Sequence, residues 1–109
     1  MIINNLDEAN LSDIQVVIIG SGPSAITLAL ELEKKKINTL MIEAGGEKYD
    51  YESQKNYKGE VVGNKISNLE HNRLRQFGGT SGHWGGWCKP LEYYNFQNWN
   101  INKKDLDKY

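Results

Sequence analysis

Short apolar runs and one amphipathic stretch alternate along the first half of the chain. The apolar run at residues 14–19 predicts a buried β-strand, and the run at 39–43 predicts a second one. Between them, residues 24–35 repeat apolar side chains at helical spacing, which predicts a helix with one face on a sheet. A strand, a helix and a strand in this order predict two parallel strands joined by a crossover helix, both strands being apolar enough to be covered on both faces.

Beyond Gly45 the pattern becomes mostly polar. Residues 47–76 carry scattered tyrosines and one short apolar piece, which predicts an excursion away from the sheet. Residues 78–86 predict a glycine-rich loop or helical turn, and residues 91–98 are irregular. Asn102, with Asp105 three positions later, predicts the start of a final helix. Residues 1–13 form a polar lead-in, and residues 14–109 form the portion of a domain that follows.

The sequence Gly-Ser-Gly-Pro-Ser-Ala stands at residues 20–25, directly after the first predicted strand. Gly20 allows a tight turn, Gly22 lets the backbone approach a pyrophosphate, and the small Ala25 lets the helix pack closely on the strand. The free N–H groups and the positive dipole end of the helix, near Ser24, would face the phosphates. Glu43 ends the second strand 21 residues after Gly22 and can accept hydrogen bonds from ribose hydroxyls. The whole unit is typical of a dinucleotide site in an α/β fold, at the start of a doubly wound, Rossmann-like domain.

A second glycine cluster distinguishes FAD from NAD, which share the first turn. Five glycines lie between residues 78 and 86. Each glycine in regular structure costs about 0.5–1 kcal/mol relative to alanine, so this density favours a loop that brings backbone N–H groups against a ligand. His83, Trp84 and Trp87 are interleaved with these glycines and suit a flat aromatic ring. The cluster therefore favours FAD as the cofactor.

Three motifs together resemble the glucose-methanol-choline (GMC) flavoprotein oxidoreductases, in particular the branch similar to pyranose oxidase and the sugar dehydrogenases. The motifs are VVIIGSGPSA at residues 16–25, LMIEAGG at 40–46 and RLRQFGGTSGHWGG at 73–86. The resemblance implies FAD bound in an extended pose and oxidation of a CH–OH donor by hydride transfer to the flavin. It also implies a small alcohol or sugar as the substrate.

The resemblance further implies which residues contact FAD. Carried over by position, they are Gly20, Gly22, Pro23, Ser24, Ala25, Glu43, Ala44, Gly78, Gly79, Thr80, Ser81, His83, Trp84, Gly85 and Gly86. The position of His83, just before Trp84, implies a covalent bond to the flavin 8α-methyl group. The alternative is that His83 only stacks or hydrogen-bonds beside the flavin.

GMC enzymes are several times longer than this chain, and their catalytic histidine lies far downstream. We therefore expect an incomplete, N-terminal part of the FAD-binding domain that ends within a helix, contains no catalytic residue and is inactive by itself. Two alternatives stay open. One is the FAD- or NAD(P)-binding domain of a different flavoprotein reductase, and the other is a non-catalytic nucleotide-binding module.

The composition limits the kinds of binding partner and the cellular location that we expect for this chain. The chain has 13 basic and 14 acidic residues and a net charge of −1, which gives no electrostatic case for nucleic acid or a membrane surface. Cys88 is the single cysteine, so neither an intrachain disulfide nor a cysteine-based metal site is expected. No apolar run is long enough for a membrane span, and the first residues lack the features of a signal peptide. We expect a cytoplasmic protein.

Overall fold

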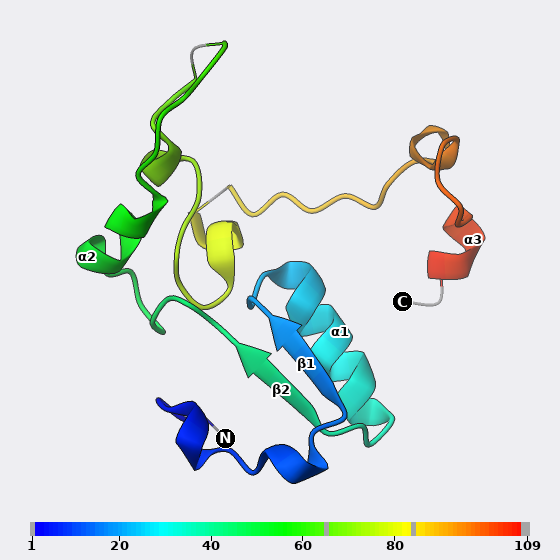
Figure 1. The fold of residues 1–109 in the computed structure, drawn as a ribbon. Helices are drawn as coiled ribbons and strands as arrows, with labels where there is room; N and C mark the ends of the chain where they lie inside the picture. The colour runs from blue at the N-terminus through cyan, green and yellow to red at the C-terminus, as the bar shows by residue number, and fades with distance from the viewer. Residues whose placement is uncertain (1, 65, 84, 108–109) are drawn as a thin grey trace.

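The computed structural model describes residues 2–64, 66–83 and 85–107 (Figure 1). Its strands are β1 (Val16–Ile19) and β2 (Thr39–Ile42), and its α-helices are α1 (Pro23–Lys34), α2 (Tyr51–Gln54) and α3 (Lys103–Leu106). The 3-10 helices are η1 (Leu6–Glu8), η2 (Leu11–Asp13), η3 (Lys55–Tyr57), η4 (Leu69–His71), η5 (Gly79–His83) and η6 (Tyr93–Phe96).

The predicted strand–helix–strand unit is present. β1 and β2 pair in parallel, with Val16 opposite Thr39 and Ile19 opposite Ile42, and α1 packs on one face of the pair. β1 is shorter than the predicted 14–19 because the N–H of Ile14 closes the η2 turn by donating to the Leu11 carbonyl (3.3 Å). This mixed α/β arrangement is compatible with the start of a nucleotide-binding domain.

Helix α1 begins one residue earlier than predicted, at Pro23. Proline suits this first position because it has no N–H to leave without a partner and its φ is already helical. The helix ends at Lys34, and Lys36 then adopts a left-handed conformation (φ 58°) that turns the chain toward β2. A non-glycine residue in that conformation costs about 1–2 kcal/mol.

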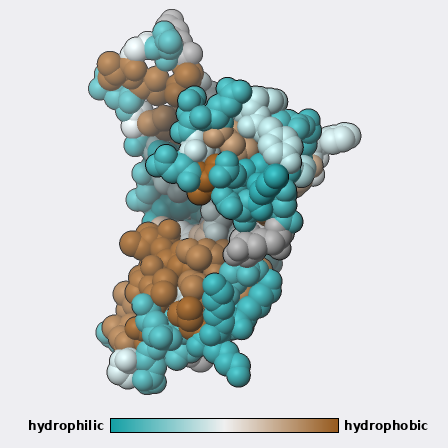
Figure 2. All heavy atoms as spheres, turned by 90° about the vertical axis from the view of Figure 1, so that its right-hand side faces the viewer, coloured by the Kyte–Doolittle hydropathy of each residue, from teal (hydrophilic) through white to brown (hydrophobic). Residues whose placement is uncertain are grey.

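The sheet is covered on one face only. Ile18 is buried against α1, whereas its neighbours Val17 and Ile19 are 53% and 86% exposed on the opposite face. Figure 2 shows apolar surface gathered in the lower half of the molecule, which contains α1 and the two strands. The strands are apolar enough to be covered on both faces, but among the described residues α1 is the helix that packs on them, so the opposite face is exposed.

Residues 47–76 leave the sheet as predicted, and Gln54 holds this excursion together. Its side chain is 3% exposed. Its amide N–H groups donate to the carbonyls of Glu70 (2.6 Å) and Arg73 (2.5 Å), and its oxygen accepts from the N–H of Arg75 (2.9 Å). One side chain from the outgoing arm thus satisfies three backbone groups of the returning arm.

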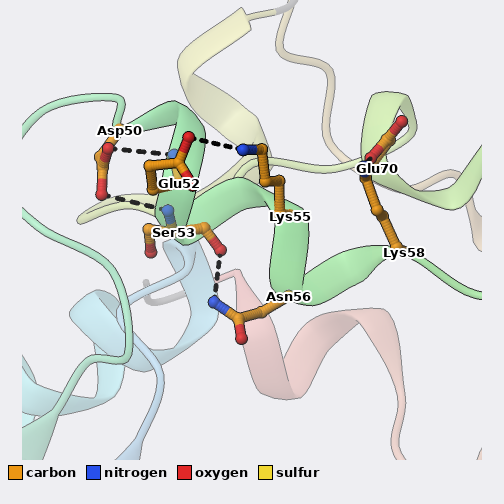
Figure 3. A network of polar contacts seen from close by, with 7 residues as sticks. All are labelled: Asp50, Glu52, Ser53, Lys55, Asn56, Lys58 and Glu70. Carbon is orange, nitrogen blue, oxygen red and sulfur yellow. Dashed lines mark hydrogen bonds and ion pairs between the residues drawn. The ribbon is translucent and has the colours of Figure 1, made fainter.

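A polar network supports the start of the same excursion (Figure 3). The Asp50 carboxylate caps α2 by accepting from the N–H groups of Glu52 and Ser53, both at 3.1 Å. Lys55 pairs with Glu52 at 2.5 Å, and Lys58 lies 3.9 Å from Glu70 on the returning arm. The sequence did not predict these helical turns, since four-residue helices have too little periodicity to be recognised.

The C-terminal part forms two short helical turns. Phe96 is buried and packs edge-on against Trp99, with ring centroids 5.4 Å apart. Residues 91–98, predicted to be irregular, contain η6 because the side chain of Asn95 caps the N–H of Glu92 (2.9 Å). The predicted cap at Asn102 is confirmed: its N–H donates to the Asp105 carboxylate at 2.9 Å, at the start of α3.

Among the described residues, no helix is long and apolar enough to cross a membrane.

Candidate functional site

The candidate site lies where β1 runs into α1. Gly20 leaves the strand by donating its N–H to the Ile42 carbonyl (2.7 Å) and has φ +91°, a conformation that favours glycine. Gly22 caps α1 with φ −67° and ψ 171°, which any residue can adopt. A Cβ added at either glycine would meet nothing within 4 Å. Conformation therefore explains Gly20, whereas neither conformation nor packing explains Gly22.

The N-terminal end of α1 leaves backbone donors available. The N–H of Ile26 donates to the Gly22 carbonyl (3.0 Å), so the N–H groups of Ser24 and Ala25 precede the helical ladder. In the part of the chain that the structure describes, no side chain caps the helix at Gly22. Pro23 contributes no donor, and its side chain is exposed. The arrangement has the donors and the positive dipole end that bind phosphate groups at helix N-termini.

Glu43 lies just beyond β2 and holds the glycine turn. Its Oε2 accepts from the Ser21 N–H (2.9 Å) and the Ser21 hydroxyl (2.6 Å), and its Oε1 accepts from the Gly45 N–H (2.8 Å). The sequence placed this carboxylate on a ribose; in the structure it also fixes the protein's own backbone. Oε2 already accepts two bonds, so the acceptor capacity that is left for a ribose hydroxyl lies on Oε1.

These hydrogen bonds favour the charged form of the Glu43 carboxyl group. Partial burial acts to raise the pKa of its carboxyl, but the hydrogen bonds from the Ser21 hydroxyl and from the N–H groups of Gly45, Ser21 and Ala44 lower the pKa below its ordinary value. Glu43 is therefore an anion at neutral pH.

The second glycine cluster folds back onto the first. The N–H of Gly78 donates to the Ser21 hydroxyl at 3.0 Å. A Cβ added at Gly79 would lie 3.7 Å from the Cα of Gly22, and both Gly78 and Gly79 have positive φ (84° and 64°). The two motifs, far apart in sequence, thus form one surface at the start of α1.

A short extension of the sheet aligns this second loop. Gly46 bridges to Gln76 in parallel, and the Phe77 N–H donates to the Gly46 carbonyl (2.9 Å). At Gly45 the two segments are so close that a Cβ would lie 2.3 Å from the Arg75 carbonyl oxygen. This contact was not predicted from the sequence, although Gly45 and Gly46, shortly after Glu43, are a signal of close backbone approach.

The remaining predicted residues are less involved. The hydroxyls of Thr80 and Ser81 bond within the second loop, to the Leu74 N–H (3.1 Å) and the Gly78 carbonyl (2.7 Å). Ala44, His83, Gly85 and Gly86 are exposed, and the described residues 85–92, which lead to η6, belong to no helix or strand (Figure 1). Trp84 lies outside the described residues. Ser21 was not predicted, because the middle position of the motif carries no local signal.

Comparisons with known proteins change the expected family. No known family profile matches the chain, and no solved structure matches it. The chain is 35% identical, over 68 residues, to a thioredoxin reductase of Bacillus subtilis (strain 168). The matched region covers 58% of this chain and 22% of that protein, so the chain spans about a fifth of the length of this relative.

This similarity overturns the expected membership of the GMC family, since the relative is named as a reductase of a different kind. The first two glycine motifs are shared by many FAD proteins, so the GMC resemblance depended mainly on one short segment, residues 73–86. Oxidation of CH–OH donors has no support from the comparisons. Covalent attachment through His83 rested on the same resemblance and is likewise unsupported. What the comparison does support is similarity to an oxidoreductase.

Among the residues that the structure describes, no group of three or more histidine, cysteine, aspartate or glutamate side chains could hold a metal ion.

Proposed function

We propose that this chain is the FAD-binding part of a flavoprotein reductase, with the pyrophosphate held at the N-terminus of α1. The observation that carries the proposal is Gly22: the structure gives no internal reason for a glycine there. A ligand gives one, because the second glycine of the dinucleotide turn lets the backbone approach a pyrophosphate closely. The similarity to a protein named thioredoxin reductase supports the reductase class.

The residues of the site fit such a ligand. The N–H groups of Ser24 and Ala25 would donate to phosphate oxygens, and Glu43 Oε1, which accepts one bond from the Gly45 N–H, would bind the adenosine ribose. FAD, when bound, supplies a ring that accepts and donates hydride. FAD is preferred over NAD because the Gly78–Gly79 backbone lies against Gly22 and offers a second glycine surface to the same ligand.

Titration of FAD into the ¹⁵N-labelled chain tests the proposal. Amide resonances of Gly22, Ser24 and Ala25 should shift in a saturable way, because the N–H groups of Ser24 and Ala25 would contact the phosphates and Gly22 precedes them in the same turn. Gly22→Ala should weaken binding by at least about tenfold, which corresponds to about 1.4 kcal/mol. The same variant should keep the wild-type spectrum elsewhere, since the added Cβ meets no protein atom within 4 Å.

Gly46→Ala is the matched control. Its Cβ would make an ordinary contact, 3.6 Å from the Lys48 carbonyl oxygen, and it lies away from the turn. It should bind FAD as the wild type does. Unchanged FAD affinity in Gly22→Ala would place the phosphates elsewhere, and a preference for NADH over FAD would replace the flavin with a nicotinamide dinucleotide.

A further inference from the structure

The most completely buried side chain described in this structure is that of Ser21, at 1% exposure. It occupies the middle of the glycine turn, between two residues with clear roles. Burying a hydroxyl is unfavourable unless its hydrogen-bonding capacity is used. Here it is used in both directions, because Ser21 donates to Glu43 Oε2 (2.6 Å) and accepts from the Gly78 N–H (3.0 Å).

These two bonds connect three separate segments. The Gly78 N–H, the Ser21 hydroxyl and the Glu43 carboxylate form a chain of donors and acceptors that ends on an anion. Bonds in such a chain polarise and strengthen one another. The partners lie 57 and 22 residues from Ser21, so the chain links the second glycine loop to the turn before α1 and to the end of β2.

Other contacts do not duplicate this link. Gly79, Thr80 and Ser81 hydrogen-bond within the segment 74–81. The backbone bonds at Gln76 and Phe77 align the loop with Gly46, not with the turn. Within the described part of the chain, the hydrogen bond that ties the loop to the turn itself is the one from Gly78 to Ser21.

We propose that Ser21 is a positioning residue that fixes the second glycine loop over the phosphate-binding turn, so that a bound dinucleotide contacts both. The proposal rests on the function proposed above and deepens it. Ser21 would affect the two halves of FAD differently. The ADP half is held by the turn and Glu43, whereas the half beyond the pyrophosphate needs the second glycine loop in place. Ser21 therefore sets the affinity for the whole dinucleotide more than the affinity for ADP.

The experiment compares FAD with ADP as two probes of the same ¹⁵N-labelled chain. In the wild type, both should shift the amides of residues 20–25, and FAD alone should also shift those of residues 78–81. Ser21→Ala removes both hydroxyl bonds. Loss of the bond to the second loop should weaken FAD binding about fivefold, the effect of one ordinary hydrogen bond. ADP binding should be nearly unchanged, because Glu43 keeps its bonds from the N–H groups of Ser21 and Gly45. Ser21→Thr, which keeps the hydroxyl, should restore FAD binding.

Ser12→Ala is the matched serine control, since the Ser12 hydroxyl bonds Asn10 in the lead-in, away from the site. Equal losses for FAD and ADP in Ser21→Ala, or no loss for either, would reject the positioning role while leaving the proposed function intact. If Ser21→Ala does not fold, the wild-type comparison decides: identical shifts with FAD and ADP reject the role. Absence of any shift at residues 20–25 with either probe would instead reject the proposed function.

Discussion

Gly45→Ala should destabilise the chain by closing the space between two backbone segments. The new Cβ would lie 2.3 Å from the Arg75 carbonyl oxygen and 2.5 Å from the Gln76 nitrogen. Both are backbone atoms, so no side chain can rotate away and the segment at 75–77 must move. That movement breaks the bond from the Phe77 N–H to the Gly46 carbonyl.

The magnitude follows from two losses. Overpacking of a tight contact costs about 1–3 kcal/mol. Loss of one backbone hydrogen bond adds about 1 kcal/mol. We therefore expect Gly45→Ala to lower the free energy of unfolding by about 2–4 kcal/mol, a large share of the 5–15 kcal/mol typical of a domain.

Urea denaturation followed by far-UV circular dichroism measures this loss. Gly46→Ala is the neighbouring control, because its Cβ lies at an ordinary 3.6 Å from the Lys48 carbonyl oxygen. Hydrogen exchange at the Phe77 amide should quicken in Gly45→Ala and not in Gly46→Ala. Equal stability of the two variants would refute the close approach of residues 45 and 75.

Three further results are expected. Gln54→Ala should lower the free energy of unfolding by about 1–3 kcal/mol, measured by urea denaturation, because backbone groups of the returning arm lose their partners; wild-type exchange at the Arg75 amide would contradict this. The pKa of Glu43 is lowered on folding, so its contribution to stability is present above the ordinary carboxyl range and is lost as the pH falls through the lowered value. Glu43→Gln should flatten that part of the stability–pH curve, and an unchanged curve would show that the carboxylate is not held by these bonds. Ile19→Thr should change the free energy of unfolding, measured by urea denaturation, by no more than about 0.5 kcal/mol, since Ile19 is 86% exposed; a large loss of stability would mean that this sheet face is covered.

The parts of the fold that were predictable are those with a strong local signal. Consecutive β-branched residues before Gly20 specify a strand, and helical spacing after Pro23 specifies a helix, so β1, α1 and β2 were located to within one or two residues. Both glycine clusters were also recognised from composition alone. Their contact with each other was not specified locally, because it depends on how the excursion at 47–76 returns.

Long-range polar contacts were the main omission. Gln54 looks like any surface glutamine in the sequence, and only the returning arm makes it a buried residue. Ser21 is similar, since its role depends on a carboxylate 22 residues away and an N–H 57 residues away. The family assignment failed for a related reason: short glycine motifs report a backbone requirement, which many nucleotide-binding proteins share.

The bonds of Gln54 have a consequence for how this chain tolerates changes in length. They join the two arms of the excursion at its base, so residues 58–64 and 66–68 form a separate lobe beyond that junction (Figure 1). At Gly63 the backbone is exposed, and a Cβ there would meet nothing within 4 Å. The entropy of closing a flexible loop grows only slowly with its length, by about 0.6 kcal/mol for each doubling. A fluorescent label or an epitope inserted after Gly63 would therefore lengthen the lobe and leave the geometry at the start of α1 unchanged.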